Sequence, residues 1–432
     1  MEENAAKPPV KKRTTISNLI LHLHPVRVPG ESIRFSHTFG LGGMAALLIV
    51  LQVFTGFLLR FQYSPSVDNA YNSLEYLQNH TFFGQLIRNA HHWSGQLLVV
   101  IVFLHLARTV MMNAYFPPRR SNWLIGLALF ILVLLMNFTG YLLPWDQLSY
   151  WAVTVVSSML DYIPFIGSPL KYQILGGHNV GQNTLLNFYN FHTGILPAVL
   201  VLLMAYHFWK VRKAGGVILP ANDEKQMVPS IPDLVMKELV TGLVLLAFIF
   251  LFSLIADAGL QERANPAVSP NPAKAPWYFL GVQELIVHLH PFFAVFLVPS
   301  GLLVLLIWLP FTRKQPASQG KWFSGENSKK TLKRVLIFTV ILIPLWIIAS
   351  ESFLKFGQWL PQLPLSVSEG VIPFLVFTGI IYFTGRYLLN KYRLPFEVMV
   401  AAGFVFISAA YIIMMVTSLV FRGPGMKLVF PF

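Results

Sequence analysis

The sequence contains no cysteine, and charged residues are scarce for its length. Without thiolates the chain can form no disulfide bond and can hold no iron–sulfur cluster. Charged residues make up 12% of the 432 residues, about half of the roughly 25% of a typical soluble domain, while apolar residues make up 55%. This composition excludes a disordered chain, a soluble nucleic-acid-binding protein and a disulfide-stabilised secreted domain.

The apolar residues are concentrated in runs that reach the length of about 18 residues needed to span a membrane. We therefore expect an all-α, polytopic membrane protein with about nine transmembrane helices. Their predicted bounds are 35–60, 89–112, 123–143, 191–211, 235–256, 284–309, 333–351, 371–390 and 397–421.

Basic residues predict the orientation of these helices. If the loops alternate sides, 23 of the 32 lysine and arginine residues fall on the side of the N-terminus and six on the other side. The positive-inside rule then places the N-terminus in the cytoplasm, and it explains the net charge of +14 without nucleic acid as a partner. Because no signal-peptide pattern opens the chain, we expect a prokaryotic cytoplasmic membrane.

A polar, proline-containing segment separates the first four spans from the rest. We predict a basic cytoplasmic segment at 1–34, a four-helix bundle at 35–213, a cytoplasmic linker at 214–234, a C-terminal domain at 235–365 and additional transmembrane helices at 366–432. The long outer loop at 144–190 is expected to carry short helices on the membrane surface.

Four histidines recur at matching heights on two predicted helices. His91 and His105 lie 14 residues apart, and His192 and His207 lie 15 apart. At about 100° per residue, each pair returns to within roughly 40–60° of one helix face, about 21–22 Å apart along the axis. Because both helices run in the same direction, His91 should face His192 and His105 should face His207. Two facing imidazoles in a four-helix bundle can hold a haem iron from both sides.

A lone histidine inside a membrane is commonly a hydrogen-bonded core residue, but four at matching heights favour haem ligation. Glycines repeat the spacing, since Gly42 and Gly56 lie 14 residues apart, as do Gly126 and Gly140. Glycine lets a flat macrocycle approach the helix backbone closely. Close packing of small residues between helices is the alternative.

Two arginines accompany the histidines. Arg88 precedes His91 by three residues, and Arg108 follows His105 by three. Because an unpaired guanidinium is costly at this depth, we predict that haem propionates pair with them. The alternative is that these side chains extend to the membrane interface.

Several segments resemble cytochrome b of the cytochrome bc and b6f complexes. Among them are LQVFTGFLLRFQYSPS at 51–66, HHWSG at 91–95 and GYLLPWDQ at 140–147. The resemblance covers roughly residues 33–310, is closer to the b6 branch, and suggests a b6-like half fused to a subunit IV-like half. The ninth span goes beyond the usual eight of the bc cytochromes.

The resemblance implies two non-covalent b-type haems with bis-histidine ligation. His91 and His192 would hold the outer haem, and His105 and His207 the inner one. Gly40 stands where the b6 branch has the cysteine of a covalent third haem. A covalent third haem is therefore excluded, and a non-covalent one is left open.

The resemblance also implies an outer site that oxidises quinol, with menaquinone or ubiquinone as the quinone. Its residues would be Tyr141, Pro144, Trp145, Trp277 and Tyr278.

The motif at this outer site departs from the family pattern. The usual Pro-Glu-Trp-Tyr reads Ala-Pro-Trp-Tyr at 275–278, so the carboxylate thought to accept a quinol proton is missing. A base must lie within hydrogen-bond reach of the quinol. We predict Glu284 as the replacement, with His288 and His290 as further candidates. The alternative is a structural Glu284 paired with Lys274 or His288.

An inner site that reduces quinone is implied near the end of the fourth span and the start of the fifth. Arg212, Lys237 and Glu238 are the predicted residues, and the alternative is that they are simply solvated. Three residues ahead of the first span either line this site or lie among lipid headgroups: His22, His24 and Arg27.

By this resemblance the chain is the di-haem subunit of a quinol:cytochrome c oxidoreductase. One electron would pass to a Rieske iron–sulfur protein and a c-type cytochrome. The other would cross the membrane to the inner quinone, coupled to proton translocation, in a homodimeric complex surrounded by membrane lipid. A non-bifurcating di-haem conduit, partnered with a multihaem c-type cytochrome or another oxidoreductase, is the first alternative. A haem-free transporter is the second.

Overall fold

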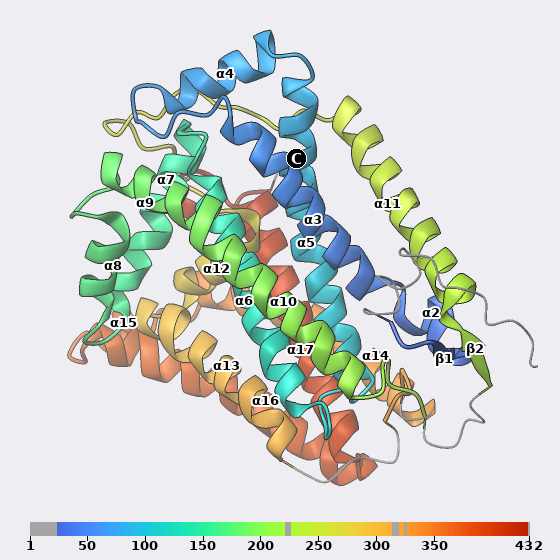
Figure 1. Cartoon of the computed structure of the whole chain (residues 1–432). Helices are drawn as coiled ribbons and strands as arrows, with labels where there is room; N and C mark the ends of the chain where they lie inside the picture. Colours follow the sequence, from blue (N-terminus) through green and yellow to red (C-terminus); the bar gives the residue numbers. More distant parts are fainter. Residues whose placement is uncertain (1–23, 221–225, 313–318, 324–325, 431–432) are drawn as a thin grey trace, which may run out of the picture.

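The computed structural model describes residues 24–220, 226–312, 319–323 and 326–430 (Figure 1). The structure is 74% helical, and its described residues include nine helices that are long and apolar enough to cross a membrane. The predicted all-α, polytopic class is therefore confirmed. Of the predicted N-terminal segment at 1–34, residues 1–23 lie outside the described residues.

The first four spans form one bundle. Their bounds are α3 (Leu41–Arg60), α5 (Gly84–Met111), α6 (Arg120–Tyr141) and α10 (Leu196–Lys213), the last continuous with α9 (Gln182–Asn190). Within it α3 packs along α5, and α6 packs along α10. A π-helical turn (Phe191–Ile195) joins α9 to α10 and contains His192.

The five rear spans fall into two groups according to the helices they pack against. They are α11 (Val235–Ile255), α13 (Val298–Trp308), α14 (Glu326–Ser352), α16 (Ile372–Tyr392) and α17 (Phe396–Val416). Helix α11 lies against α5 and α3 of the front bundle, apart from the other rear helices (Figure 1). Helix α17 packs between α14, the short helix α12 (Leu280–His288) and α5.

Short elements connect the spans. The helices are α2 (Phe35–Thr38), α4 (Ala70–His80), α7 (Gln147–Met159), α8 (Gly167–Leu175) and α15 (Phe356–Trp359). Strands β1 (Arg27–Pro29) and β2 (Met227–Pro229) pair antiparallel, with Val28 opposite Val228. The long loop predicted to hold short helices contains α7, α8 and α9.

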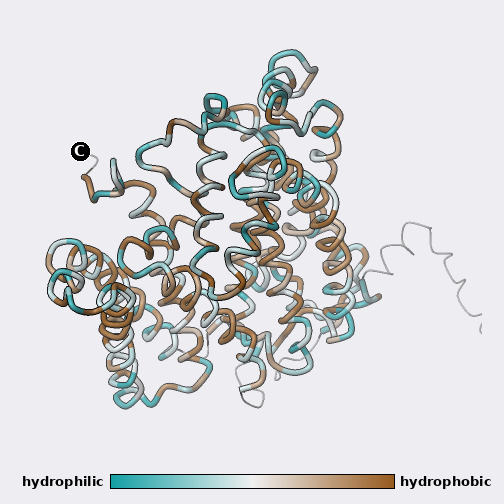
Figure 2. Tube along the Cα trace, turned by 90° about the vertical axis from the view of Figure 1, so that its left-hand side faces the viewer, coloured by the Kyte–Doolittle hydropathy of each residue, from teal (hydrophilic) through white to brown (hydrophobic). Residues whose placement is uncertain are grey.

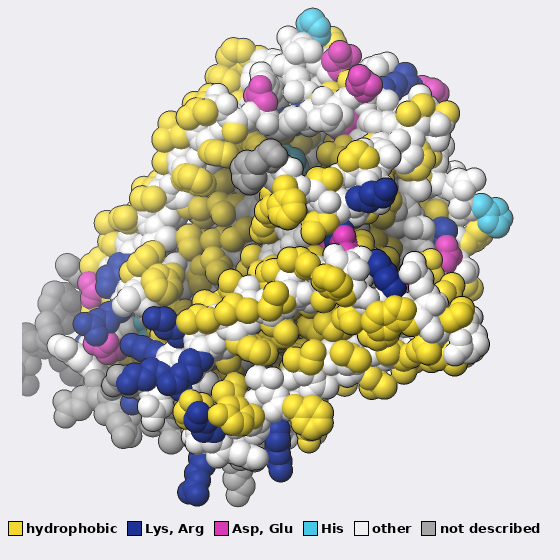
Figure 3. All heavy atoms as spheres, turned by 180° about the vertical axis from the view of Figure 1, so that it is seen from behind, with side chains coloured by type: hydrophobic (Ala, Val, Ile, Leu, Met, Phe, Trp, Pro, Cys, Tyr) yellow, Lys and Arg dark blue, Asp and Glu magenta, His cyan; other side chains and the backbone are white. Residues whose placement is uncertain are grey.

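Polarity follows the axis of the bundle. The middles of the helices are hydrophobic and their ends hydrophilic in Figure 2. Lysine and arginine side chains gather at the lower end of the face shown in Figure 3. This is the distribution expected of a multi-pass membrane protein.

The sixth span differs from its prediction. Instead of one helix over 284–309, α12 ends at His288, Leu289 is extended (φ −137°, ψ 147°), and the membrane-spanning helix begins at Phe292. The break lies beside Pro291, which lacks a backbone donor and disfavours helical geometry in the residue before it. Glu284 and His288 therefore lie on a separate short helix.

Asp146 caps α7 and joins it to the loop after α11. Its carboxylate accepts hydrogen bonds from the backbone N–H of Ser149 (2.8 Å) and of Gln261 (3.1 Å), and the residue is buried. We expect Asp146→Ala to lower the stability by about 1–3 kcal/mol, because it removes a cap and leaves a backbone donor unpaired. The measurement is the midpoint of heat-induced unfolding in detergent.

Asp161→Ala is the matched control. The Asp161 carboxylate pairs with Lys171 on the surface, and such a pair contributes at most about 1 kcal/mol. Equal losses in the two variants would contradict the role assigned to Asp146.

Candidate functional site

The four histidines predicted as ligands meet in two pairs at two levels of the front bundle. The ring centres of His91 and His192 lie 6.2 Å apart, with planes at 83°. Those of His105 and His207 lie 6.5 Å apart, at 73°. All four come from the two parallel helical segments α5 and α9–α10.

These separations fit a metal ion held between two imidazoles. Two metal–nitrogen bonds of about 2.0–2.1 Å, with about 1.1 Å from each nitrogen to its ring centre, place the ring centres about 6.3 Å apart. Hydrogen bonds to the Nδ1 atoms also orient the two rings of the outer pair. The Nδ1 atom of His91 lies 2.8 Å from the Thr55 hydroxyl, and Nδ1 of His192 lies 2.9 Å from the Met136 carbonyl. Such bonds leave Nε2 as the ligand atom.

Each of the four predicted glycines lies against a histidine of its own level. A Cβ atom added at Gly56 would lie 3.1 Å from His91 Cε1, and one added at Gly140 would lie 2.5 Å from His192 Cε1. Gly42 faces His105 and Gly126 faces His207 in the same way, at 3.3 and 3.6 Å. The glycines therefore make room for the imidazole rings, a role that the sequence analysis did not foresee.

The two arginines differ in their partners. Arg88 donates to the carbonyl oxygens of Ala258 and Gly259, so the loop after α11 satisfies it. Arg108 donates from Nε to the His37 carbonyl at 3.1 Å, but its Nη2 is buried with no hydrogen-bond partner among the described residues. An unpaired buried guanidinium donor beside His105 fits an anionic group such as a propionate.

The predicted outer site joins two segments. Trp145 precedes α7, is buried and has a positive φ of 52°. The Ala264 N–H donates to its carbonyl at 3.1 Å, which fixes the loop after α11 beside it. Tyr141 ends α6, and Pro144 lies between it and Trp145. Phe138, one turn earlier on α6, contacts Phe279 at 5.7 Å between ring centres, which places α6 beside the Trp277–Tyr278 pair.

That aromatic pair lies at the start of α12. Trp277 donates from Nε1 to the Gln96 side chain on α5, at 2.5 Å. Tyr278 is buried, and its hydroxyl has no hydrogen-bond partner among the described residues. A buried, unpaired phenol is a potential donor to a ligand.

Glu284 is fully buried in an ion pair. Arg422 approaches it with two nitrogens, Nε at 2.9 Å from Oε2 and Nη2 at 2.5 Å from Oε1, and His288 Nε2 lies 3.0 Å from Oε1. Lys274, one of the two partners considered for a structural Glu284, instead donates to the Leu419 carbonyl. His290 lies beyond the helix break. Arg422 was missed because it follows the last span, where an arginine gives no signal of its own.

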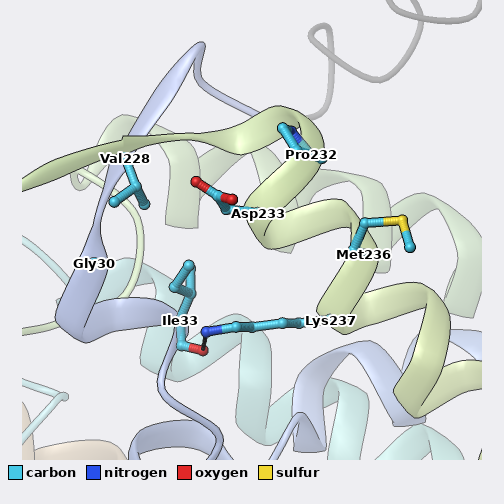
Figure 4. Close-up of a pocket in the computed structure, with 7 residues that line it drawn as sticks. All are labelled: Gly30, Ile33, Val228, Pro232, Asp233, Met236 and Lys237. Atoms are coloured by element: carbon cyan, nitrogen blue, oxygen red, sulfur yellow. Dashed lines mark hydrogen bonds between the residues drawn. The ribbon is translucent and has the colours of Figure 1, made fainter.

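The inner end holds a cavity of about 490 Å³, shown in Figure 4. It is lined by Gly30, Ile33, Val228, Pro232, Asp233, Met236 and Lys237. The Lys237 ammonium donates to the Ile33 carbonyl at 3.1 Å, and the Asp233 carboxylate is turned toward the same space. Asp233 was missed, although it lies one helical turn before Lys237.

The other residues predicted at the inner end lie outside this cavity. Glu238 lies 3.3 Å from His24 Nε2, and Arg212 is exposed in the last turn of α10. Arg27 donates to the Met227 carbonyl across the two-stranded sheet. His22 lies outside the described residues.

Comparisons with known proteins agree with this arrangement. The family model of cytochrome b/b6/petB matches residues 29–215. Cytochrome b6 of Acaryochloris marina (strain MBIC 11017) is 39% identical over 175 residues, which cover 40% of this chain and 81% of that protein. A chain of a hyperthermophilic respiratory Complex III shares the fold, with a TM-score of 0.66 and 22% identity over 94% of this chain and 96% of that chain. This chain therefore belongs to the cytochrome b/b6 family of multi-pass electron-transport proteins.

Proposed function

We propose that this chain is the di-haem cytochrome b subunit of a quinol:cytochrome c oxidoreductase. The observation that carries the proposal is the pair of imidazole separations, 6.2 and 6.5 Å, at two levels of one bundle. His91 and His192 would hold the outer b haem, and His105 and His207 the inner one. When bound, the two haems would supply one-electron transfer across the membrane.

At the outer level the proposed quinol site lies between α6, the segment before α7 and the start of α12. The unpaired Tyr278 hydroxyl would donate a hydrogen bond to the quinol head group. The predicted residues Tyr141, Pro144, Trp145 and Trp277 would form the walls. The sequence predicted Glu284 as the proton acceptor because position 276 is proline, but Arg422 encloses its carboxylate in an ion pair that competes with protonation.

At the inner level the cavity of Figure 4 would bind quinone. The Lys237 ammonium would donate a hydrogen bond to one quinone oxygen. Asp233 would take up protons from the aqueous phase and pass them to the quinone oxygens as the quinone is reduced. Glu238 would lie next to this site, in its pair with His24, and Arg212, in the last turn of α10, is the other residue predicted for it.

The proposed assembly follows from the family. A Rieske iron–sulfur protein and a c-type cytochrome would accept electrons at the outer side, in a homodimer with its N-termini in the cytoplasm of a prokaryote. The quinone at both proposed sites would be menaquinone or ubiquinone. Pro276 and the ion-paired Glu284 favour a second candidate, a di-haem conduit that passes both electrons along one path.

The two candidates differ in their response to an oxidant. With quinol present and the inner site blocked, a pulse of ferricyanide should transiently reduce the b haems of the purified complex if quinol oxidation bifurcates. The reason is that removal of the first electron leaves a semiquinone that reduces haem b. Simple oxidation of the b haems would instead support the conduit, and absence of b-haem absorbance would refute both.

Substitution of one inner ligand should remove one haem. We expect His105→Ala to halve the haem content per polypeptide, because a six-coordinate b haem is held only by its two axial histidines and packing. The pyridine haemochrome assay and reduced-minus-oxidised spectra measure this content. His92→Ala is the control, since His92 contacts Trp93 outside the pairs. Full haem content in His105→Ala would contradict the assignment.

Lys237 should control quinone binding at the inner end. A hydrogen bond from a charged donor contributes about 1.5–3 kcal/mol, so Lys237→Ala should weaken quinone binding by about 10–100-fold. The measurement is the quinone dependence of haem b reoxidation. Lys210→Ala, whose ammonium lies over Tyr206 and Trp209, should leave that dependence unchanged. The proposal fails if both variants behave alike.

A further inference from the structure

The end of the ninth helix folds back over the segment that begins α12. The Tyr411 hydroxyl on α17 donates to the Tyr278 carbonyl, and a Cβ atom at Gly281 would lie 2.6 Å from the Tyr411 ring. Beyond α17 the contact continues through two further hydrogen bonds, from Lys274 Nζ to the Leu419 carbonyl (2.8 Å) and from the Gly425 N–H to Asn271 Oδ1 (2.6 Å). These three hydrogen bonds join segments that are about 130–155 residues apart in the chain.

Arg422 lies at the centre of this contact. Its side chain has no exposed surface, and it joins three elements: Glu284 on α12, Glu351 at the end of α14, and the Met426 carbonyl of its own segment. His288 completes the cluster, with Nε2 3.3 Å from Arg422 Nη2 and Nδ1 2.7 Å from the Ser350 hydroxyl.

The charges explain why this position needs arginine. Two carboxylates and one imidazole converge on a site where Glu284 has no access to water. A buried carboxylate is tolerated only when it is paired and hydrogen-bonded, and a planar guanidinium can meet both oxygens of one carboxylate while reaching a second. Lys274, which precedes α12 in the chain, donates instead to the Leu419 carbonyl.

The ion pair also fixes the direction of α12. The helix has only nine residues, and it follows directly from the short turn Trp277–Phe279. Because Leu289 is extended, no continuous helix holds α12 from the membrane side. Tyr411 holds the start of this segment and Arg422 holds its middle, so the ninth helix and the residues after it add two contacts to those from Gln96 on α5 and Ser350 on α14.

We propose that Arg422 is a positioning residue of the outer quinol site, and that the ninth helix is thereby part of that site. Arg422 holds Glu284, Glu284 holds α12, and α12 presents Trp277 and Tyr278. Glu284 then acts as an anchor, and its carboxylate stays ionised throughout the reaction. This inference rests on the proposed oxidation of quinol at the outer side.

Four variants of the purified complex test the inference: Arg422→Gln, Arg422→Lys, Glu284→Gln and the double variant Glu284→Gln/Arg422→Gln. For each, haem content, kcat and KM for quinol are measured. Arg422→Gln leaves a buried carboxylate unpaired, so KM should rise at least about tenfold while both haems remain, because the haem ligands lie in the front bundle. Arg422→Lys keeps the charge but loses the two-nitrogen contact, so an intermediate KM is expected.

The double variant separates an anchor from a base. With the charges of Glu284 and Arg422 removed, their two amides can still pair, and the Glu351 carboxylate, which is 24% exposed, can be solvated. We therefore expect KM and kcat to return to within about threefold of the unmodified protein. Lys427→Gln is the matched control, because it removes an exposed cation from the same segment without touching the cluster. It should leave kcat and KM unchanged.

The outcomes that overturn the inference are distinct. Unchanged KM in both Arg422 variants, with haem retained, would show that Arg422 positions nothing at the site. Equal loss of kcat in Glu284→Gln and in the double variant would make Glu284 the proton acceptor. If Arg422→Gln fails to assemble, the Arg422→Lys and double variants decide alone. If the unmodified complex holds both haems but does not oxidise quinol, the proposed function fails before the inference is reached.

Discussion

The distance between two imidazoles controls the front half of this molecule. Each pair has its ring centres about 6 Å apart, the separation that the proposed haem ligation requires, and this separation is matched by the spacing of α5 and α9–α10. The neighbouring helices must then avoid the rings. A Cβ atom would crowd the facing ring at Gly42, Gly56 and Gly140, whereas at Gly126 it would make an ordinary contact of 3.6 Å. Threonine and backbone groups behind the outer pair fix the ring orientation. Helix spacing, glycine placement and the hydrogen bonds behind the outer rings thus all fit one proposed requirement.

Three buried arginines show different solutions to placing a cation in an apolar protein. Arg88 is satisfied by two backbone carbonyls, and Arg422 by two carboxylates. Arg108 is only partly satisfied, with one nitrogen buried and unpaired among the described residues. The first two are complete within the chain and so serve its structure. The third has a donor left over, which fits the proposed pairing with an anionic group from outside the chain.

The sequence predicted those features that depend on a regular pattern of residues within one segment. The nine spans follow from apolar runs, and the histidine pairs follow from spacing alone, because both depend only on helix geometry. The break at Leu289 was hidden because the residues around it are apolar enough to read as one span, although Pro291 marked it. Asp233 and Arg422 could not be ranked, since their importance depends on contacts with residues from other segments. The same holds for the glycines, whose neighbours are the rings of another helix.

The π-helical turn at Phe191–Ile195 explains why the two histidine spacings differ by one residue. A π-turn is equivalent to one residue inserted into an α-helix. The 15 residues from His192 to His207 therefore advance the helix about as far, and rotate it about as much, as the 14 residues from His91 to His105. The wider turn takes up the extra residue locally and leaves the rest of the helix unchanged. A relative with a spacing of 14 in this helix and no π-turn would therefore hold its two histidines at the same places. The positions of the two histidines along this helix thus depend on the kind of helical turn between them as well as on the number of residues.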